Sequence, residues 1–167
     1  LPTYLAQYLN FSPGDSAIIF TISTFAISMT AFIAIFVYER LGHNMELTIF
    51  LAFSSAAVCF ALVFFTKQPV LNIILMIMAI ISSNSAASML WSRYCPSLRD
   101  TGMVSGATGF IDFVSYMAAS VSSTVFAGAV DGIGWSGLVL VWGGLVALGI
   151  VVALPWGKIL RRPNSAW

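Results

Sequence analysis

The fold is decided by Leu47–Ser92, LTIFLAFSSAAVCFALVFFTKQPVLNIILMIMAIISSNSAASMLWS, a stretch that contains one charged residue, Lys67. About 20 mostly apolar residues are enough to cross the roughly 30 Å of hydrocarbon in a bilayer. The segments on either side of Lys67 are both long enough, and Pro69 favours a tight turn between them. The stretch therefore predicts two membrane-spanning helices that run antiparallel to one another.

The composition of the whole chain excludes a water-soluble domain. Of its 167 residues, 59% are hydrophobic and 8% are charged, and the mean hydropathy is +0.96. Soluble domains carry about 25% charged residues. The net charge of +1 offers no basic patch for nucleic acid. Cys59 and Cys95 form neither a disulfide framework nor a metal-ligand spacing, so we expect small apolar side chains there and no metal or cofactor.

Five segments meet the length requirement for a membrane span, and short joints connect them. The predicted spans are about 16–38, 47–66, 70–92, 103–130 and 136–157. Long helices with short joints predict an all-α, polytopic transmembrane bundle rather than a barrel. Before the first span, Ser12 is the expected N-cap, Pro13 the first helical residue and Asp15 the anion at the positive helix end. Leu1–Leu9 resembles the end of a preceding, sixth span.

The lysines and arginines of the joints predict the orientation, because positive residues collect on the cytoplasmic side. One side has Lys67 alone, and the other has the six remaining basic residues: Arg40, Arg93, Arg99, Lys158, Arg161 and Arg162. We therefore expect the N-terminus outside and a cytoplasmic tail over residues 158–167. Trp135, Trp142 and Trp156 lie near the ends of the last span, where tryptophan anchors a helix at the membrane interface.

Polar residues gather on the spans 16–38, 70–92 and 103–130, whereas the other two spans suit lipid. On the fourth span they recur every three or four residues and so share one face. Small polar residues also form ordinary packing faces between helices, and this alternative stays open. The predicted pathway for a solute or proton consists of eight side chains: Thr24, Ser28, Asn84, Ser88, Thr108, Asp112, Ser115 and Tyr116.

Asp112 is the one charged residue that falls in the middle of a predicted span. If that span starts near Thr101, the helical rise places Asp112 about 16 Å deep, close to the midplane. A charge at that depth costs at least roughly 2.5 to 3.5 kcal/mol unless it has a partner or faces water. Proton coupling, a gating ion pair, contact with a cationic substrate and a structural hydrogen bond, for example to Tyr116, are the alternatives.

Several short motifs resemble the major facilitator superfamily. Glu39–His43, ERLGH, is similar to the D-R-x-G-R part of its cytoplasmic loop motif, which recurs in weaker form between the eighth and ninth helices. Leu1–Leu5, Gly109–Phe110, Ser115–Tyr116 and Val130–Trp135 resemble segments of the organophosphate/phosphate antiporter branch. The resemblance covers nearly the whole chain and places it as the C-terminal half of the fold, from the end of helix 7 to helix 12.

The resemblance implies part of a secondary active transporter in the cell membrane, either a bacterial inner membrane or a plasma membrane. Its implied partners are the lipid bilayer, an N-terminal six-helix half and a small-molecule solute, with proton coupling or anion exchange as the driving reaction. Glu39, Arg40 and Gly42 would form a cytoplasmic gate loop, although Arg40 equally fits ordinary positive-inside topology. Because no Lys or Arg falls within the five spans, the residues present do not support an organophosphate substrate.

Two other classes of function remain as alternatives. One is a membrane receptor or assembly subunit that transports nothing. The other is an intramembrane enzyme such as an aspartyl protease, which needs two aspartates sharing a proton. Only Asp112 lies inside a span, and the single histidine, His43, lies in a joint. We therefore expect no catalytic site.

Overall fold

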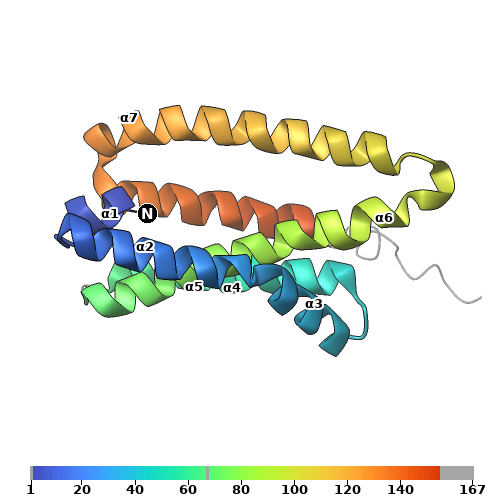
Figure 1. Cartoon of the computed structure of the whole chain (residues 1–167), viewed down its shortest axis with the longest axis horizontal. Coiled ribbons are helices and arrows are strands. Elements are labelled where there is room, and N and C mark those ends of the chain that lie inside the picture. Colours follow the sequence, from blue (N-terminus) through green and yellow to red (C-terminus); the bar gives the residue numbers. More distant parts are fainter. Residues whose placement is uncertain (1, 67, 155–167) are drawn as a thin grey trace, which may run out of the picture.

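The computed structural model describes residues 2–66 and 68–154, and these residues form helices joined by short connections (Figure 1). No strand occurs in the described ranges, so the predicted all-α class is confirmed. The elements in chain order are α1 (Pro2–Gln7), α2 (Pro13–Ser28), α3 (Thr30–Arg40), α4 (Met45–Phe65), α5 (Pro69–Met89), the π-helix η1 (Leu90–Tyr94), α6 (Cys95–Ser97), the 3₁₀-helix η2 (Arg99–Thr101) and α7 (Val104–Ala153).

Four helical stretches within the described residues are long and apolar enough to cross a membrane. They are Pro13–Arg40, Met45–Phe65, Pro69–Ser97 and Val104–Ala153. The last has 50 residues, which as one straight helix would be about 75 Å long. No bilayer core is that thick.

A break at Gly134 divides α7 into two parts. Gly134 has φ 67° and ψ 176°, a backbone conformation that is not helical and that glycine adopts without steric cost. We call residues 104–133 the first limb and residues 135–153 the second limb. The second limb runs back in the opposite direction to the first (Figure 1). The break falls inside the joint predicted at residues 131–135.

The start of α2 has the predicted cap. Ser12 is the N-cap, and its Oγ accepts a hydrogen bond from the Asp15 backbone N–H at 3.1 Å. The same hydroxyl donates to the Asp15 carboxylate at 2.7 Å. Pro13 occupies the first helical position, where its missing N–H costs nothing. This prediction is confirmed.

Two helix boundaries differ from the predictions. The predicted span 16–38 is divided at Met29 into α2 and α3. Ser28 donates its hydroxyl hydrogen bond to the carbonyl of Thr24, and such back-bonding often bends helices. The joint expected from Arg93 onward is instead helical as far as Ser97, because η1 and α6 continue α5. Pro96 lies one residue before the end of this continuous helix.

The core of the bundle lies between α4, α5 and the second limb of α7. Phe60 and Val63 of α4, Met76 and Ala79 of α5, and Val139 of the second limb are all buried. The ring of Phe53 lies 3.0 Å from the position a Cβ would take at Gly149, so glycine allows α4 and the second limb to approach closely. This layer holds the described helices together.

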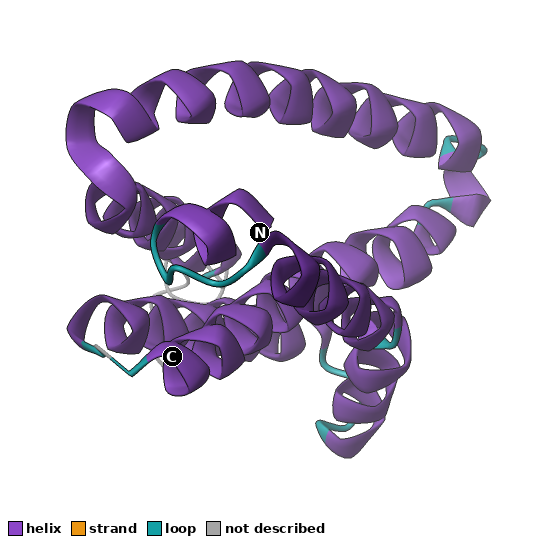
Figure 2. Cartoon of the chain, turned by 60° about the vertical axis from the view of Figure 1, so that its left-hand side comes forward, coloured by secondary structure: helices purple, strands orange, loops and turns teal. Residues whose placement is uncertain are grey.

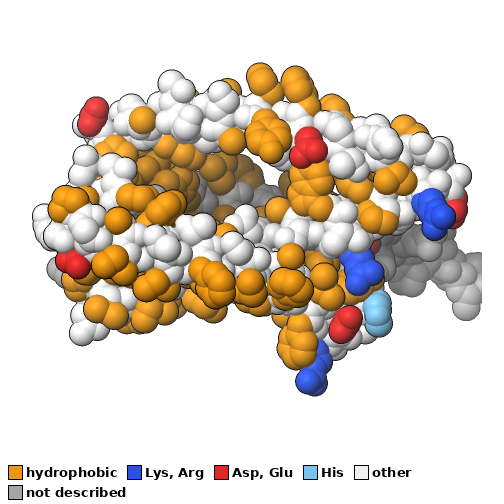
Figure 3. Space-filling view, viewed as in Figure 1, with side chains coloured by type: hydrophobic (Ala, Val, Ile, Leu, Met, Phe, Trp, Pro, Cys, Tyr) orange, Lys and Arg blue, Asp and Glu red, His pale blue; other side chains and the backbone are white. Residues whose placement is uncertain are grey.

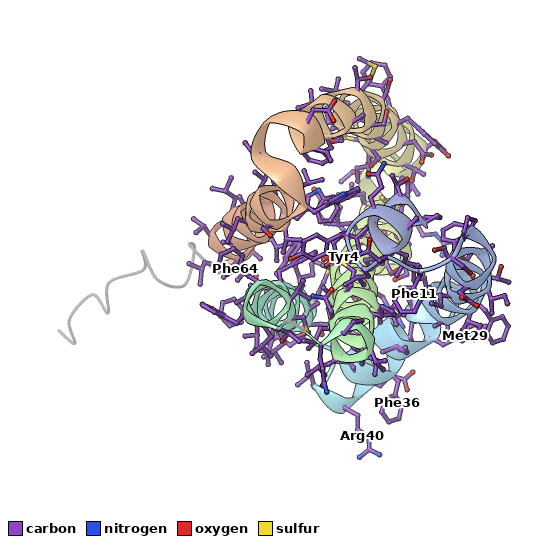
Figure 4. All side chains as sticks on the ribbon, turned by 90° about the vertical axis from the view of Figure 1, so that its left-hand side faces the viewer. Tyr4, Phe11, Met29, Phe36, Arg40 and Phe64 are labelled. Carbon is purple, nitrogen blue, oxygen red and sulfur yellow. The ribbon has the colours of Figure 1, made fainter. Side chains whose placement is uncertain are left out.

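A buried polar network fastens the end of α4. Asn72, 1% exposed, donates from Nδ2 to the carbonyls of Val63 and Thr66, each at 3.3 Å. Val63 lies in the last turn of α4 and Thr66 is its C-cap. The Val63 carbonyl also accepts from the Thr66 backbone N–H at 3.3 Å, whereas the Thr66 carbonyl has no other described donor. The Asn72 carbonyl accepts from the Tyr4 hydroxyl at 2.6 Å. Tyr4 points into the middle of the bundle, whereas Arg40 points away from it (Figure 4). Asn72 thus ties α1 and α5 to the end of α4.

The described basic residues all lie toward one end of the molecule (Figure 3). These residues are Arg40, Arg93 and Arg99. The other four basic residues used to predict the orientation, Lys67, Lys158, Arg161 and Arg162, lie outside the described residues, as does Trp156.

Candidate functional site

The first limb of α7 carries Asp112 and has little contact with the other helices. Neither of the two buried residues of α7 lies on it, since both Leu138 and Val139 belong to the second limb. The limb arches over the remaining helices (Figure 2), and the space-filling view shows a hollow beneath it (Figure 3). Asp112 and Ser115 are exposed, and Tyr116 is 75% exposed. This polar face is therefore uncovered within the described chain.

Asp112 forms no hydrogen bond or ion pair with any other described residue. The hydrogen bond to Tyr116 that the sequence left open is not formed. The guanidinium of Arg93 lies over the ring of Tyr38, 4.7 Å from its centroid, and does not pair with Asp112. A partner for Asp112 must therefore come from outside residues 2–66 and 68–154, or be water.

Three of the predicted pathway hydroxyls bond to their own helices. Thr24 donates to the carbonyl of Phe20, Ser28 to that of Thr24, and Thr108 to that of Val104, each at 2.8 Å. A hydroxyl satisfied in this way can face an apolar neighbour at little cost. Thr24, Ser28 and Thr108 are thus compatible with a packing face as well as with a pathway.

Asn84 and Ser88 lie on α5. Asn84 is exposed and Ser88 is half-buried. Neither side chain donates or accepts a hydrogen bond among the described residues. The adjacent Ser85 points elsewhere, because it is 7% exposed and donates to the carbonyl of Ile81. Like Asp112, Asn84 therefore has hydrogen-bonding capacity that the described chain leaves unused, but no contact brings the two together.

The predicted gate loop follows α3 and has a well-defined geometry. The N–H of Gly42 donates to the carbonyl of Glu39 at 3.2 Å, and the N–H of His43 donates to that of Tyr38 at 3.0 Å. This pair of bonds is a Schellman motif, with Gly42 at φ 63° in the left-handed position. Gly42 therefore ends α3, a structural role that the motif's spacing alone does not reveal.

The charged residues of the gate loop are not paired with one another. The Arg40 guanidinium lies over the ring of Phe36 at 5.2 Å. Within the described part of the chain, Glu39 and Arg40 form no ion pair. The rings of His43 and Tyr38 meet edge to face, with centroids 5.2 Å apart, so His43, Tyr38 and Arg93 form a cluster that joins the end of α3 to η1.

No protein-family model, curated protein or solved structure matches this chain. Its function is therefore argued from the arrangement of its own residues.

Two tryptophans of the second limb pack against the other helices. Trp135 and Trp142, which are predicted interfacial anchors, are both partly buried against the core. Trp135 meets the ring of Tyr4 edge-on at 5.3 Å, and Trp142 lies 6.3 Å from the ring of Phe60. They are seven residues apart, which on a helix places them on the same face. That spacing is the signal in the sequence for inward packing.

We expect Gly42→Ala to lower the free energy of unfolding by about 1 kcal/mol, because alanine is strained at φ 63°. No atom lies within 4 Å of the added methyl group, so the effect comes from the backbone alone. Denaturation followed by circular dichroism in detergent measures it. Gly144→Ala is the matched control: this glycine is helical and equally unobstructed, so the variant should be as stable as the parent or more stable. Equal losses in both variants would contradict the backbone explanation.

Proposed function

We propose that this chain is the C-terminal, membrane-embedded half of a secondary active transporter of the major facilitator type. It acts with an N-terminal six-helix half, and the two halves rock about a site near the midplane that opens to each side in turn. Five spans belong to this proposal, with the two limbs of α7 as the fourth and fifth. The solute is a small molecule, and the chain resides in a cell membrane with its C-terminus in the cytoplasm.

The observation that carries the proposal is the position of Asp112. It lies about 12 Å from the start of α7 by helical rise, on a limb without buried residues and without a described partner. A carboxylate at that depth cannot face hydrocarbon without a large cost. The face that carries Asp112 must therefore be covered by another helix or by water, as it is in a transporter with a central aqueous pathway.

The distribution of polar residues supports the same arrangement. Polar side chains with unused hydrogen-bonding capacity occur on α5 and on the first limb, at Asn84 and Asp112. In contrast, α4 and the second limb bury apolar residues against each other and against α5. The polar helices fit a central pathway and the apolar pair fits the periphery next to lipid.

Of the two coupling reactions considered, proton coupling fits the described residues better than anion exchange. An anion in the pathway would need a basic residue to bind it. Arg93 is the described basic residue farthest from a joint, and it lies over Tyr38 near the end of the helix that begins at Pro69. Asp112 is a carboxyl group that can take up and release a proton.

Cysteine labelling of the full-length protein in membrane vesicles tests whether the Asp112 face meets water. In a Cys59→Ser, Cys95→Ser background, Ser115→Cys lies on the Asp112 face, and Met117→Cys lies 200° around the helix at nearly the same depth. Both positions are exposed in the described chain. A membrane-impermeant thiol reagent should label Ser115→Cys at least about ten-fold faster, because only a water-filled pathway brings it to that depth.

Equal labelling of the two cysteines, or faster labelling of Met117→Cys, would contradict the proposal. Protection of both would indicate that the first limb packs against another helix on all sides, as in an assembly subunit, and would also contradict it. Native mobility on size-exclusion chromatography checks that each variant is folded.

A further inference from the structure

A cavity of about 330 Å³ lies where α1 meets the two limbs of α7, at the end of the molecule opposite the gate loop. Its lining includes Gln7 of α1, Phe126 and Asp131 of the first limb, and Trp135 and Trp142 of the second limb. Pockets for small ligands begin at about 300 Å³ and combine apolar walls with a few polar groups. This cavity has that size and composition, and none of its residues belongs to the predicted pathway.

The electrostatics of the cavity favour a cation. Among the described residues that line it, Asp131 is the only charged one, and it forms no ion pair with the rest of the described chain. Asp131 also lies three residues before the break at Gly134, at the C-terminal end of the first limb. The last carbonyls of a helix carry a partial negative charge that adds to that of the carboxylate.

The aromatic walls of the cavity favour an organic cation over a metal ion. Phe126 and Trp142 meet edge to face, with ring centroids 6.0 Å apart, and Trp135 packs against Tyr4. The ring of Trp142 also packs against Phe60 of α4, with centroids 6.3 Å apart, so a core contact positions the ring. A cation within about 6 Å of such a ring is attracted to its face, and tryptophan is the strongest of the aromatic partners.

We propose that this cavity binds a small organic cation with an alkylated or quaternary ammonium group. The carboxylate of Asp131 balances its charge, and Phe126, Trp135 and Trp142 surround its alkyl groups. Under the orientation predicted from the basic residues the cavity opens on the outer side of the membrane. The inference does not depend on transport, since it concerns binding alone.

Titration of the whole chain in detergent with tetramethylammonium chloride tests the proposal. Tryptophan fluorescence should change in a saturable way, whereas sodium chloride at equal ionic strength should leave it unchanged. Asp131→Asn should weaken binding about ten-fold or more, and Phe126→Leu should also weaken it because leucine keeps an apolar side chain but lacks the aromatic face. Asp15→Asn, which removes the same charge from the first turn of α2 at the same end of the molecule, should bind as the parent does.

An identical response to tetramethylammonium and sodium would overturn the proposal, and so would unchanged binding by Asp131→Asn. Stronger binding of a neutral sugar such as glucose than of tetramethylammonium would overturn the cation assignment. If Phe126→Leu fails to fold, Asp131→Asn still decides the question, because Asp131 is exposed and packs no core. A failure here leaves the labelling result at Ser115 untouched, so the two proposals fail separately.

Discussion

Under the proposed transport function, Asp112→Asn is expected to abolish proton-coupled uptake by the full-length protein while leaving expression and folding unchanged. Asparagine has nearly the shape of aspartate, but it cannot take up or release a proton. Because Asp112 is exposed and forms no hydrogen bond within the described chain, its replacement breaks no contact there. The loss therefore concerns the coupling reaction and not the stability of the fold.

Reconstituted vesicles with an imposed proton gradient measure this effect, with a panel of solutes from which those accumulated by the parent are chosen. The variant should no longer accumulate them, whereas exchange without a gradient should persist, because binding and rocking do not require the proton. Asp100→Asn is the matched control, since it removes an exposed carboxylate from η2 outside the predicted spans. Uptake by Asp112→Asn with the parental pH dependence would exclude Asp112 from the mechanism.

Asn72→Leu should have the largest effect on stability, lowering the free energy of unfolding by about 2 to 4 kcal/mol. Leucine fills most of the space but leaves the Tyr4 hydroxyl and the Thr66 carbonyl without their partner, and it removes one of the two hydrogen bonds to the Val63 carbonyl. A buried group deprived of its hydrogen bond costs about 1 to 3 kcal/mol. Hydrogen bonds between membrane helices average nearer 0.6 kcal/mol. Three of them, the number that Asn72 forms, give the lower end of the range expected for Asn72→Leu.

Two controls separate the network from a general effect of removing an amide. Asn84→Leu changes the same side chain on the same helix at an exposed position without described hydrogen bonds, and should shift stability by less than about 0.5 kcal/mol. Tyr4→Phe removes one of the three hydrogen bonds and should fall between the two. Chemical denaturation in detergent followed by circular dichroism gives all three values. Equal stability of Asn72→Leu and Asn84→Leu would refute the proposed role of Asn72.

The helices themselves could be predicted from the sequence because their signals are local. Ser12, Pro13 and Asp15 lie next to one another and define the start of α2 by short-range hydrogen bonds. Gly134 is a residue type that permits the φ of 67° at the break in α7. By contrast, nothing next to Arg93 indicates that the helix continues as η1, since a π-helix has no strong residue signature.

The contacts between helices could not be predicted, because they join residues far apart in the chain. In the sequence, Asn72 is one of several polar residues of the span 70–92, and its partner Tyr4 lies 68 residues away. The spacing of Trp135 and Trp142 indicates one shared face, but their partners Tyr4 and Phe60 lie far away in the chain. The surroundings of two predicted pathway residues could not be predicted either. Asp112 and Asn84 reach no partner within the described residues, so their environment depends on what covers the first limb.

The network at Asn72 also constrains the order in which this protein assembles. The carbonyl of Thr66 has no donor among the described residues except the amide of Asn72 on α5, whereas that of Val63 also accepts from the Thr66 backbone N–H. Burying the Thr66 carbonyl without its donor costs about 1 to 3 kcal/mol. A nascent chain should therefore release α4 from the insertion machinery only together with α5, so that the two enter the bilayer as one hairpin.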